Sequence, residues 1–136
     1  MKLSDNFWVN EFQRSETAVR LDIQEQFEPL PEYVLSNLND LCDEVLQPLR
    51  NAFQARMFIN SGYRCPALNK AVGGSKNSDH MKGGAADIVC KDPEMLYKMA
   101  IELGLPFKQL ILYKSRNFVH ISYDENDKRK QSWEQA

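Results

Sequence analysis

Residues 78–90 read SDHMKGGAADIVC, a polar loop that passes through two glycines into a short apolar strand. Side chains alternate between the two faces of a strand. Ala86 and Ile88 therefore share one face, and Asp87 lies on the other. A carboxylate thus projects from a strand that is otherwise built of small and apolar residues.

A second strand carries a histidine in the same manner. In residues 117–123, NFVHISY, the alternation places His120 opposite the apolar side chains. If the two strands are neighbours, His120 and Asp87 share a face. His80 precedes Asp87 by seven residues, and the flexible stretch 82–84 is long enough to fold a loop histidine back over the strand. The pattern predicts that two imidazoles and one carboxylate converge.

Three nitrogen and oxygen ligands with an open fourth position are typical of catalytic zinc, which holds a water molecule at that position. The spacing lacks the regularity of an HEXXH helix, however. A loop histidine and a strand histidine are also found as simple polar contacts. From the residues alone, the zinc site and the polar-contact interpretation both remain open.

The rest of the chain predicts an α+β fold with a small, mostly antiparallel sheet and helices packed on one of its faces. Apolar residues at three- and four-residue spacing predict a long helix from Pro31 to Phe53, with a kink or restart near Gln47 because Pro48 removes a backbone donor. A second helix is expected from Pro93 to Leu103. The expected strands are residues 57–60, 85–90, 109–113 and 117–123.

The chain has 136 residues, which predicts one domain over residues 1–136. Phe7, Trp8, Val9 and Phe12 predict a short N-terminal helix that covers the core. Residues 124–136 form a charged C-terminal tail to which we assign no function.

Composition excludes several classes of partner. The 17 basic and 19 acidic residues give a net charge of −2, so we expect no nucleic-acid partner. Apolar runs are too short for a membrane span, and the N-terminus shows no signal peptide, which favours cytoplasmic synthesis. Cys42, Cys65 and Cys90 are odd in number and far apart, so we expect free thiols. We expect a monomer.

Two other kinds of site are disfavoured. Residues 73–76, GGSK, lack the spacing of a phosphate-binding loop, and we expect these glycines to end a short helix that starts at Pro66. A nucleophilic pair of Cys90 with His120 would need both side chains on one face, whereas Cys90 faces the core.

Five segments in a fixed order resemble the zinc D-alanyl-D-alanine carboxypeptidase family. They are SGYR at 61–64, LN at 68–69, VGGS at 72–75, SDHMKGGAADI at 78–88 and FVHIS at 118–122. The relatives include phage endolysins, and the fold is shared with vancomycin-resistance dipeptidases and the hedgehog signalling domain. The resemblance covers nearly the whole chain, so it implies a fold of this hedgehog and D-Ala-D-Ala peptidase type.

The resemblance implies roles for individual residues. His80, Asp87 and His120 match the family's ligands for zinc (Zn2+). Arg64 matches an arginine that holds the substrate's carbonyl or carboxylate, a task that suits its fork of donors, although a surface ion pair is the alternative. Ser78 matches a position near the substrate, where capping of the local turn is the alternative.

The match is incomplete at the general base. Family members have an acid shortly before the last histidine ligand, where this chain has Tyr113 and Asn117. Asn117 cannot take up a proton, and Tyr113 is a poor base that could donate a hydrogen bond to an oxyanion. Asp79, Asp124 and Glu125 are the nearest acids in the sequence, and ordinary surface charge is the alternative for each.

The resemblance implies a zinc-dependent peptidase that cuts peptidoglycan stem peptides at a D-alanine-containing bond, as a carboxypeptidase or an endopeptidase. One alternative is a zinc-containing module that binds cell-wall peptides with little or no turnover. Another is a domain in which both histidines are polar contacts and no zinc binds. A phage or prophage lysis or tail protein released to the cell wall fits the absence of a signal peptide.

Overall fold

The computed structural model describes residues 1–127 and 129–136. Lys128, within the charged tail, lies outside the described residues. The elements in chain order are β1 (Lys2–Ser4), β2 (Phe7–Trp8), α1 (Val9–Gln13), α2 (Glu16–Arg20), the 3₁₀ helix η1 (Gln24–Phe27), α3 (Glu32–Leu41), the π-helical segment η2 (Cys42–Leu46), α4 (Gln47–Phe53), β3 (Phe58–Ser61), α5 (Pro66–Ala71), the 3₁₀ helix η3 (Asp79–Lys82), β4 (Ala85–Val89), α6 (Pro93–Glu102), β5 (Gln109–Tyr113), β6 (Phe118–Ser122) and β7 (Gln131–Gln135).

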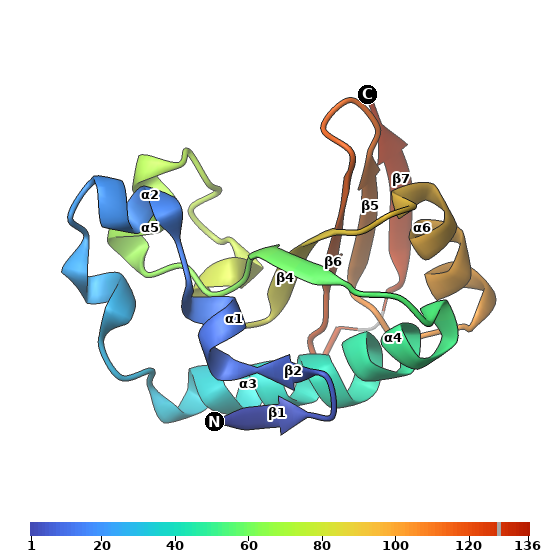
Figure 1. The fold of residues 1–136 in the computed structure, drawn as a ribbon, viewed down its shortest axis with the longest axis horizontal. Coiled ribbons are helices and arrows are strands. Elements are labelled where there is room, and N and C mark those ends of the chain that lie inside the picture. Colours follow the sequence, from blue (N-terminus) through green and yellow to red (C-terminus); the bar gives the residue numbers. More distant parts are fainter. Residues whose placement is uncertain (128) are drawn as a thin grey trace.

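The main sheet has five strands in the order β3-β4-β6-β5-β7 (Figure 1). The pairs among β3, β4, β6 and β5 are antiparallel, and β7 joins β5 in parallel. The four strands predicted from the sequence are present, with bounds that differ by at most one residue. The predicted α+β fold with a mostly antiparallel sheet is confirmed.

The fifth strand corrects the description of residues 124–136 as a charged tail. Residues 131–135 form β7 at the edge of the sheet, in register with residues 109–113 of β5. All five of its side chains are exposed, so the strand lacks the apolar alternation by which a half-buried strand is recognised. The segment before it turns as expected, because the Asp127 amide donates to the Asp124 carbonyl over 3.0 Å.

The predicted long helix is three consecutive helical segments, α3, η2 and α4, which run along the bottom of Figure 1. Pro48 has no amide hydrogen for the carbonyl four residues earlier. The helical turn just before Pro48 is widened by one residue, so the Gln47 amide donates to the Cys42 carbonyl five residues earlier. The predicted restart near Gln47 is confirmed, and the widened turn keeps Val45 and Leu46 both buried.

The remaining predicted helices are also present. Asp92 accepts a hydrogen bond from the Met95 amide and caps α6, and Gly104 follows this helix in a left-handed conformation. The short helix expected from Pro66 is α5. Within the described part of the chain, none of the helices combines the length and the apolar character that crossing a bilayer requires.

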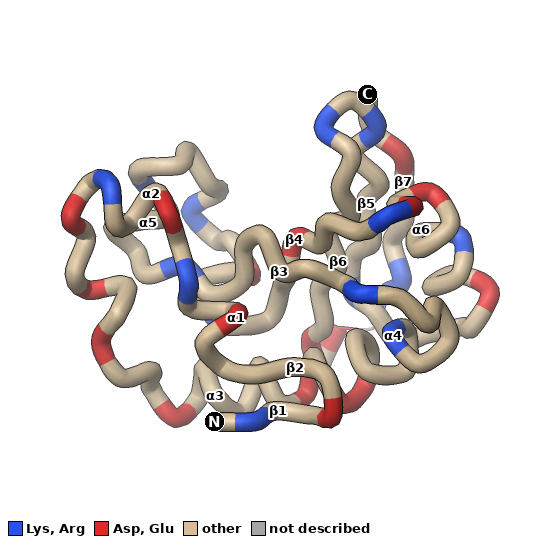
Figure 2. Tube along the Cα trace, viewed as in Figure 1, with Lys and Arg blue, Asp and Glu red and all other residues tan. Residues whose placement is uncertain are grey.

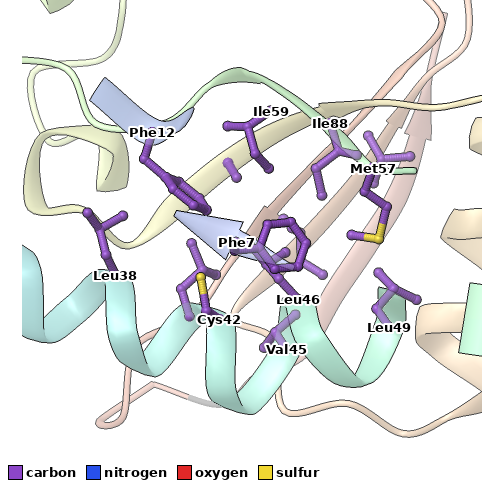
Figure 3. Close-up of a cluster of buried hydrophobic side chains, with 14 of the residues drawn as sticks. Phe7, Phe12, Leu38, Cys42, Val45, Leu46, Leu49, Met57, Ile59 and Ile88 are labelled. Atoms are coloured by element: carbon purple, nitrogen blue, oxygen red, sulfur yellow. The ribbon is translucent and has the colours of Figure 1, made fainter. Parts of the chain in front are cut away.

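The hydrophobic core lies between these helices and the sheet face that carries Ala86, Ile88, Val119 and Ile121. Figure 3 shows side chains from the helical segments, from β3 and β4 and from the N-terminal segment meeting in one cluster. Cys42 and Cys65 are buried and Cys90 is half-buried, and all three are free, as predicted. The helices thus cover one face of the sheet, and the other face is left for the site.

The N-terminal segment covers the core as expected, but its secondary structure differs from the prediction. Phe7 and Trp8 belong to a strand that pairs with β1, and the helix begins only at Val9. Phe7 and Phe12 are buried, whereas Trp8 is 47% exposed. A β-turn at residues 5–6 reverses the chain here, and aromatic density alone does not distinguish a strand from a short helix.

Candidate metal centre

The strand register places the first two residues of the site opposite each other. Asp87 of β4 pairs with His120 of β6, on the sheet face away from the core. His80 comes from η3, which ends at Gly83 in a left-handed conformation that glycine adopts without strain. The Gly84 amide then donates to the Asp79 carbonyl over 3.0 Å, which closes the loop over the strand.

His80, Asp87 and His120 form a compact cluster, as predicted. Each offers one ligand atom, and these atoms lie within 4.8 Å of one another. His120 Nδ1 lies 2.9 Å from Asp87 Oδ1, and His80 Nε2 lies 3.4 Å from the same oxygen. The two imidazole rings are 5.2 Å apart between centroids. These three side chains could hold a metal ion.

A backbone carbonyl fixes the orientation of His80. Its Nδ1 lies 2.7 Å from the Gly62 carbonyl oxygen, which can only accept, so Nδ1 donates and Nε2 is presented to Asp87. Metal-binding histidines commonly have such a partner on the second ring nitrogen. A β-carbon at Gly62 would lie 2.6 Å from the Phe12 Cα, so only glycine allows α1 to approach this closely.

The environment of Asp87 favours its carboxylate form. Burial alone would raise the pKa of Asp87, but its contacts with His120 and His80 outweigh burial and hold this pKa well below its usual range. The cluster therefore contains an anionic oxygen donor between two nitrogen donors. This donor set suits zinc, which binds nitrogen and carboxylate ligands in proteins.

Arg64 lies beside the cluster and is held on three sides. Its Nη2 is 3.6 Å from Asp87 Oδ2, its Nε donates to Ser61 over 3.2 Å, and its Nη1 donates to Asn69 over 3.0 Å. Burial lowers the pKa of Arg64, and the Asp87 charge opposes that shift. Arg64 is therefore a mostly buried group fixed against the metal centre, not the surface ion pair considered above.

Gly74 makes room for this arginine. A β-carbon at position 74 would lie 2.8 Å from Arg64 Nη1 and would also collide with the Asn69 side chain. Asn69 is itself buried, and its amide donates to the Ser75 carbonyl over 2.9 Å. The VGGS segment after α5 thus shapes the pocket that holds the guanidinium.

Ser78 and Tyr113 both line the same cavity as the cluster. Ser78 Oγ accepts a hydrogen bond from the His80 amide over 3.2 Å, so the capping role considered for it is present. Tyr113 stacks on Phe118, with ring centroids 4.5 Å apart. Burial and the nearby Asp87 charge raise the pKa of Tyr113, so its hydroxyl is protonated near neutral pH.

The acids named from the sequence do not line this cavity. Both Asp79 oxygens accept from Lys108 Nζ over 3.0 Å, and Asp124 accepts from the Asn126 amide. Asn117 has a φ of 61° in the turn between β5 and β6. Asparagine tolerates this left-handed conformation better than most residues, which accounts for its presence there.

The cavity has a volume of about 610 Å³ and lies over the sheet face that carries Asp87 and His120. Its walls are the segment from Arg14 to Thr17 and the end of α5 on one side, and the β5–β6 hairpin on the other (Figure 1). The sequence analysis did not identify four of its lining residues, Arg14, Glu16, Phe58 and Arg116. They come from separate segments, and no spacing in the sequence connects them.

Comparison with curated protein sequences gives no match. The sequence pattern of the Peptidase M15 family matches residues 5–122, which include all three members of the cluster and Arg64. That match spans most of the chain and agrees with the resemblance found from the SGYR, SDHMKGGAADI and FVHIS segments. The chain therefore belongs to the Peptidase M15 family, the zinc D-Ala-D-Ala carboxypeptidase-like metallopeptidases.

Proposed function

We propose that this protein hydrolyses peptidoglycan stem peptides at a D-alanine-containing peptide bond, with zinc held by His80, Asp87 and His120. The observation that carries the proposal is the cluster itself, which lies on the floor of a 610 Å³ cavity beside the fixed guanidinium of Arg64. A metallopeptidase needs a metal centre that a peptide can reach, and this cavity provides the access.

One separation in the cluster matches that of two zinc ligands, and all three ligand atoms lie within 4.8 Å of one another. Two ligand atoms at 2.0–2.1 Å from a tetrahedral zinc ion lie about 3.3 Å apart. The 3.4 Å between His80 Nε2 and Asp87 Oδ1 matches that separation. The shorter His120–Asp87 contact is a hydrogen bond that metal binding would replace. Three protein ligands leave a fourth position for water, as catalytic zinc requires.

The chain's own residues have distinct roles in this mechanism. Zinc supplies Lewis acidity towards water and the peptide carbonyl when it is bound. Arg64 orients the substrate by hydrogen bonding to its carbonyl or carboxylate. Tyr113 donates from its neutral hydroxyl to the oxygen on which negative charge develops. Ser78 donates its hydroxyl hydrogen to a peptide group while its oxygen caps η3.

A carboxylate that accepts the proton of water is the remaining requirement. Among the described residues, Asp87 and Glu16 are the carboxylates that line the cavity. Asp87 belongs to the cluster, and Glu16 lies at the start of α2 on the opposite wall. The hydrolysis rate of Glu16→Gln therefore tests whether Glu16 accepts the proton of water. The rate of Tyr113→Phe tests whether the Tyr113 hydroxyl stabilises the oxyanion.

A second function is favoured by one observation. Positions 113 and 117 carry tyrosine and asparagine where the family resemblance implies an acid, and the acids nearest in sequence do not line the cavity. A module with these features could bind cell-wall peptides through its metal and Arg64 with little turnover. The two functions share the same site and differ only in catalytic rate.

Mass spectrometry of purified muropeptides incubated with the zinc-loaded protein separates these functions. The proposal expects loss of a terminal alanine or an internal cut, abolished by a chelator and by His120→Ala. Uncut muropeptide that binds the zinc-loaded protein would instead establish the binding module. Arg20→Gln, on the exposed surface of α2 and outside the cavity, serves as the control variant.

A further inference from the structure

Two arginines of the cavity have no role in the mechanism above. Arg14 lies between α1 and α2, and Arg116 lies in the turn between β5 and β6. Both are exposed and both line the cavity. Figure 2 shows how basic and acidic residues are distributed along the Cα trace. Within residues 1–127 and 129–136, neither side chain has an acidic partner within 4 Å.

Arg14 is oriented by an aromatic ring rather than by a carboxylate. Its guanidinium carbon lies 4.8 Å from the centroid of the Phe58 ring, which also lines the cavity. Stacking on an aromatic face restrains a guanidinium and leaves the N–H groups at its edge free to donate. Arg14 is thus a restrained donor at the rim of the cavity.

Arg116 lies at the other wall, near Tyr113. The two residues are three positions apart in the β5–β6 hairpin, and the Arg116 charge acts to lower the pKa of Tyr113 against the effect of burial. Tyr113 pairs with Phe118, two residues before His120 on the same strand face. Arg116 is therefore at the end of the cavity that carries the metal cluster.

Two aromatic side chains add apolar surface to the cavity. Phe58 and Phe118 both line the cavity, on the outer strand β3 and on β6 respectively. Phe58 pairs with Val89, two residues after Asp87 on β4, and so lies one row from the cluster. These two rings can accommodate aliphatic parts of a peptide beside the cluster.

The charges around the cavity favour an anionic substrate. Three arginines line it against two carboxylates, and one of these, Asp87, already contacts the histidines and Arg64, which leaves Arg14 and Arg116 against Glu16. The protein as a whole has a net charge of −2, so the positive character is local to the cavity. A bound divalent metal ion would increase it further.

We propose that the cavity selects a peptide with a carboxylate beyond the group held by Arg64, and that Arg14 or Arg116, one on each wall, binds that carboxylate. The inference rests on the proposed peptidase function, because it specifies the substrate of the same site. The carboxylate can belong to an acidic residue within the peptide or to its C-terminus. Both sources present the same planar anion to a guanidinium.

The test compares three synthetic stem peptides of one sequence with the zinc-loaded protein. One has a free carboxylate on its D-glutamate residue and at its C-terminus, one is amidated at D-glutamate, and one is amidated at the C-terminus. A charge-assisted hydrogen bond corresponds to about a tenfold difference or more, so we expect kcat/KM to fall at least that much for one amidated peptide. The affected peptide identifies the source of the carboxylate.

Variants connect this preference to the two arginines. We expect Arg14→Gln or Arg116→Gln to lower kcat/KM for the free peptide towards that of the amidated one, with little change for the amidated peptide. Arg20→Gln is the matched control and should retain the preference. Equal rates for all three peptides, or a preference that survives both substitutions, would overturn the inference while leaving the peptidase function intact.

Calorimetry keeps the inference testable if no peptide is cleaved. Affinity of the zinc-loaded protein for the same three peptides then replaces kcat/KM. A loss of affinity on amidation that Arg14→Gln or Arg116→Gln removes would support the carboxylate contact, although the proposed hydrolysis had failed. Equal affinities, or no binding of any peptide, would overturn it.

Discussion

At the scale of single residues, Gly74 controls the position of Arg64. A methyl group at position 74 would collide with Arg64 Nη1 and with Asn69. We expect Gly74→Ala to weaken binding of an anionic stem peptide about tenfold, because a charge-assisted contact is lost or misplaced. The variant should still bind one zinc ion per chain, since Gly74 is not one of the three cluster residues.

Calorimetry with the peptide and, separately, with zinc measures both quantities for this variant. Lys76→Ala, an exposed change in the same loop, is the control. Peptide affinity that stays at the wild-type value in Gly74→Ala would show that Arg64 does not hold the substrate.

The sequence predicted the residues whose position follows from short-range rules. Strand alternation placed Asp87 and His120 on one face, and the glycines after His80 allowed its return to that face. The lining residues Arg14 and Arg116 follow no such rule, because their positions depend on how α2 and the β5–β6 hairpin pack around the sheet. Contacts of this kind are tertiary and leave no periodic signal.

At the scale of elements, Gln26 joins α1 to the segment that carries Arg64. This fully buried side chain donates to the carbonyls of Gln13 and Tyr63, each over 2.9 Å, and accepts from the Cys65 amide over 2.8 Å. Gln26→Ala leaves two buried backbone groups and one part-buried group without this partner. Each unpaired group costs about 1–3 kcal/mol, so we expect the free energy of unfolding to fall by roughly 4 kcal/mol.

Urea denaturation of the two proteins measures this difference. Gln24 lies in the same 3₁₀ helix and its side chain is exposed. We expect Gln24→Ala to change the free energy of unfolding by less than about 0.5 kcal/mol. A Gln26→Ala variant as stable as Gln24→Ala would mean that water replaces the lost hydrogen bonds.

Elements with an apolar period were predicted, and elements without one were missed. The helices α3, α4 and α6 bury apolar residues that recur at three- and four-residue spacing, and the four predicted strands contain short apolar runs. The strand β7 has exposed side chains throughout and is held by backbone pairing to β5. A strand held only by backbone pairing has no characteristic side-chain pattern, so a single sequence does not reveal it.

At the scale of the whole molecule, the core and the candidate metal centre lie on opposite faces of one sheet. The apolar cluster packs against the helices and does not include His80, Asp87 or His120. The fold therefore does not depend on the metal for its core. We expect the metal-free protein to be folded and cooperative, and zinc to stabilise it by binding only the native state.

A zinc concentration a thousand times the Kd adds about 4 kcal/mol to the free energy of unfolding. For a protein of this size, that corresponds to a rise in Tm of roughly 10 °C or more. Differential scanning calorimetry should show this rise in the wild type, its reversal by a chelator, and its absence in His120→Ala. A Tm that does not rise with zinc would mean that zinc does not bind preferentially to the native state.

Titration of the metal-free protein with zinc tests the central claim most directly, because the peptidase function depends on the cluster of His80, Asp87 and His120. We predict one zinc ion per chain for the wild type and at least about 100-fold weaker binding for Asp87→Asn, since even outer contacts of metal ligands contribute 10- to 100-fold. Asp43→Asn, an exposed aspartate on η2, should bind zinc as the wild type does. Failure of the wild type to bind zinc, or equal affinity in Asp87→Asn, would contradict the account.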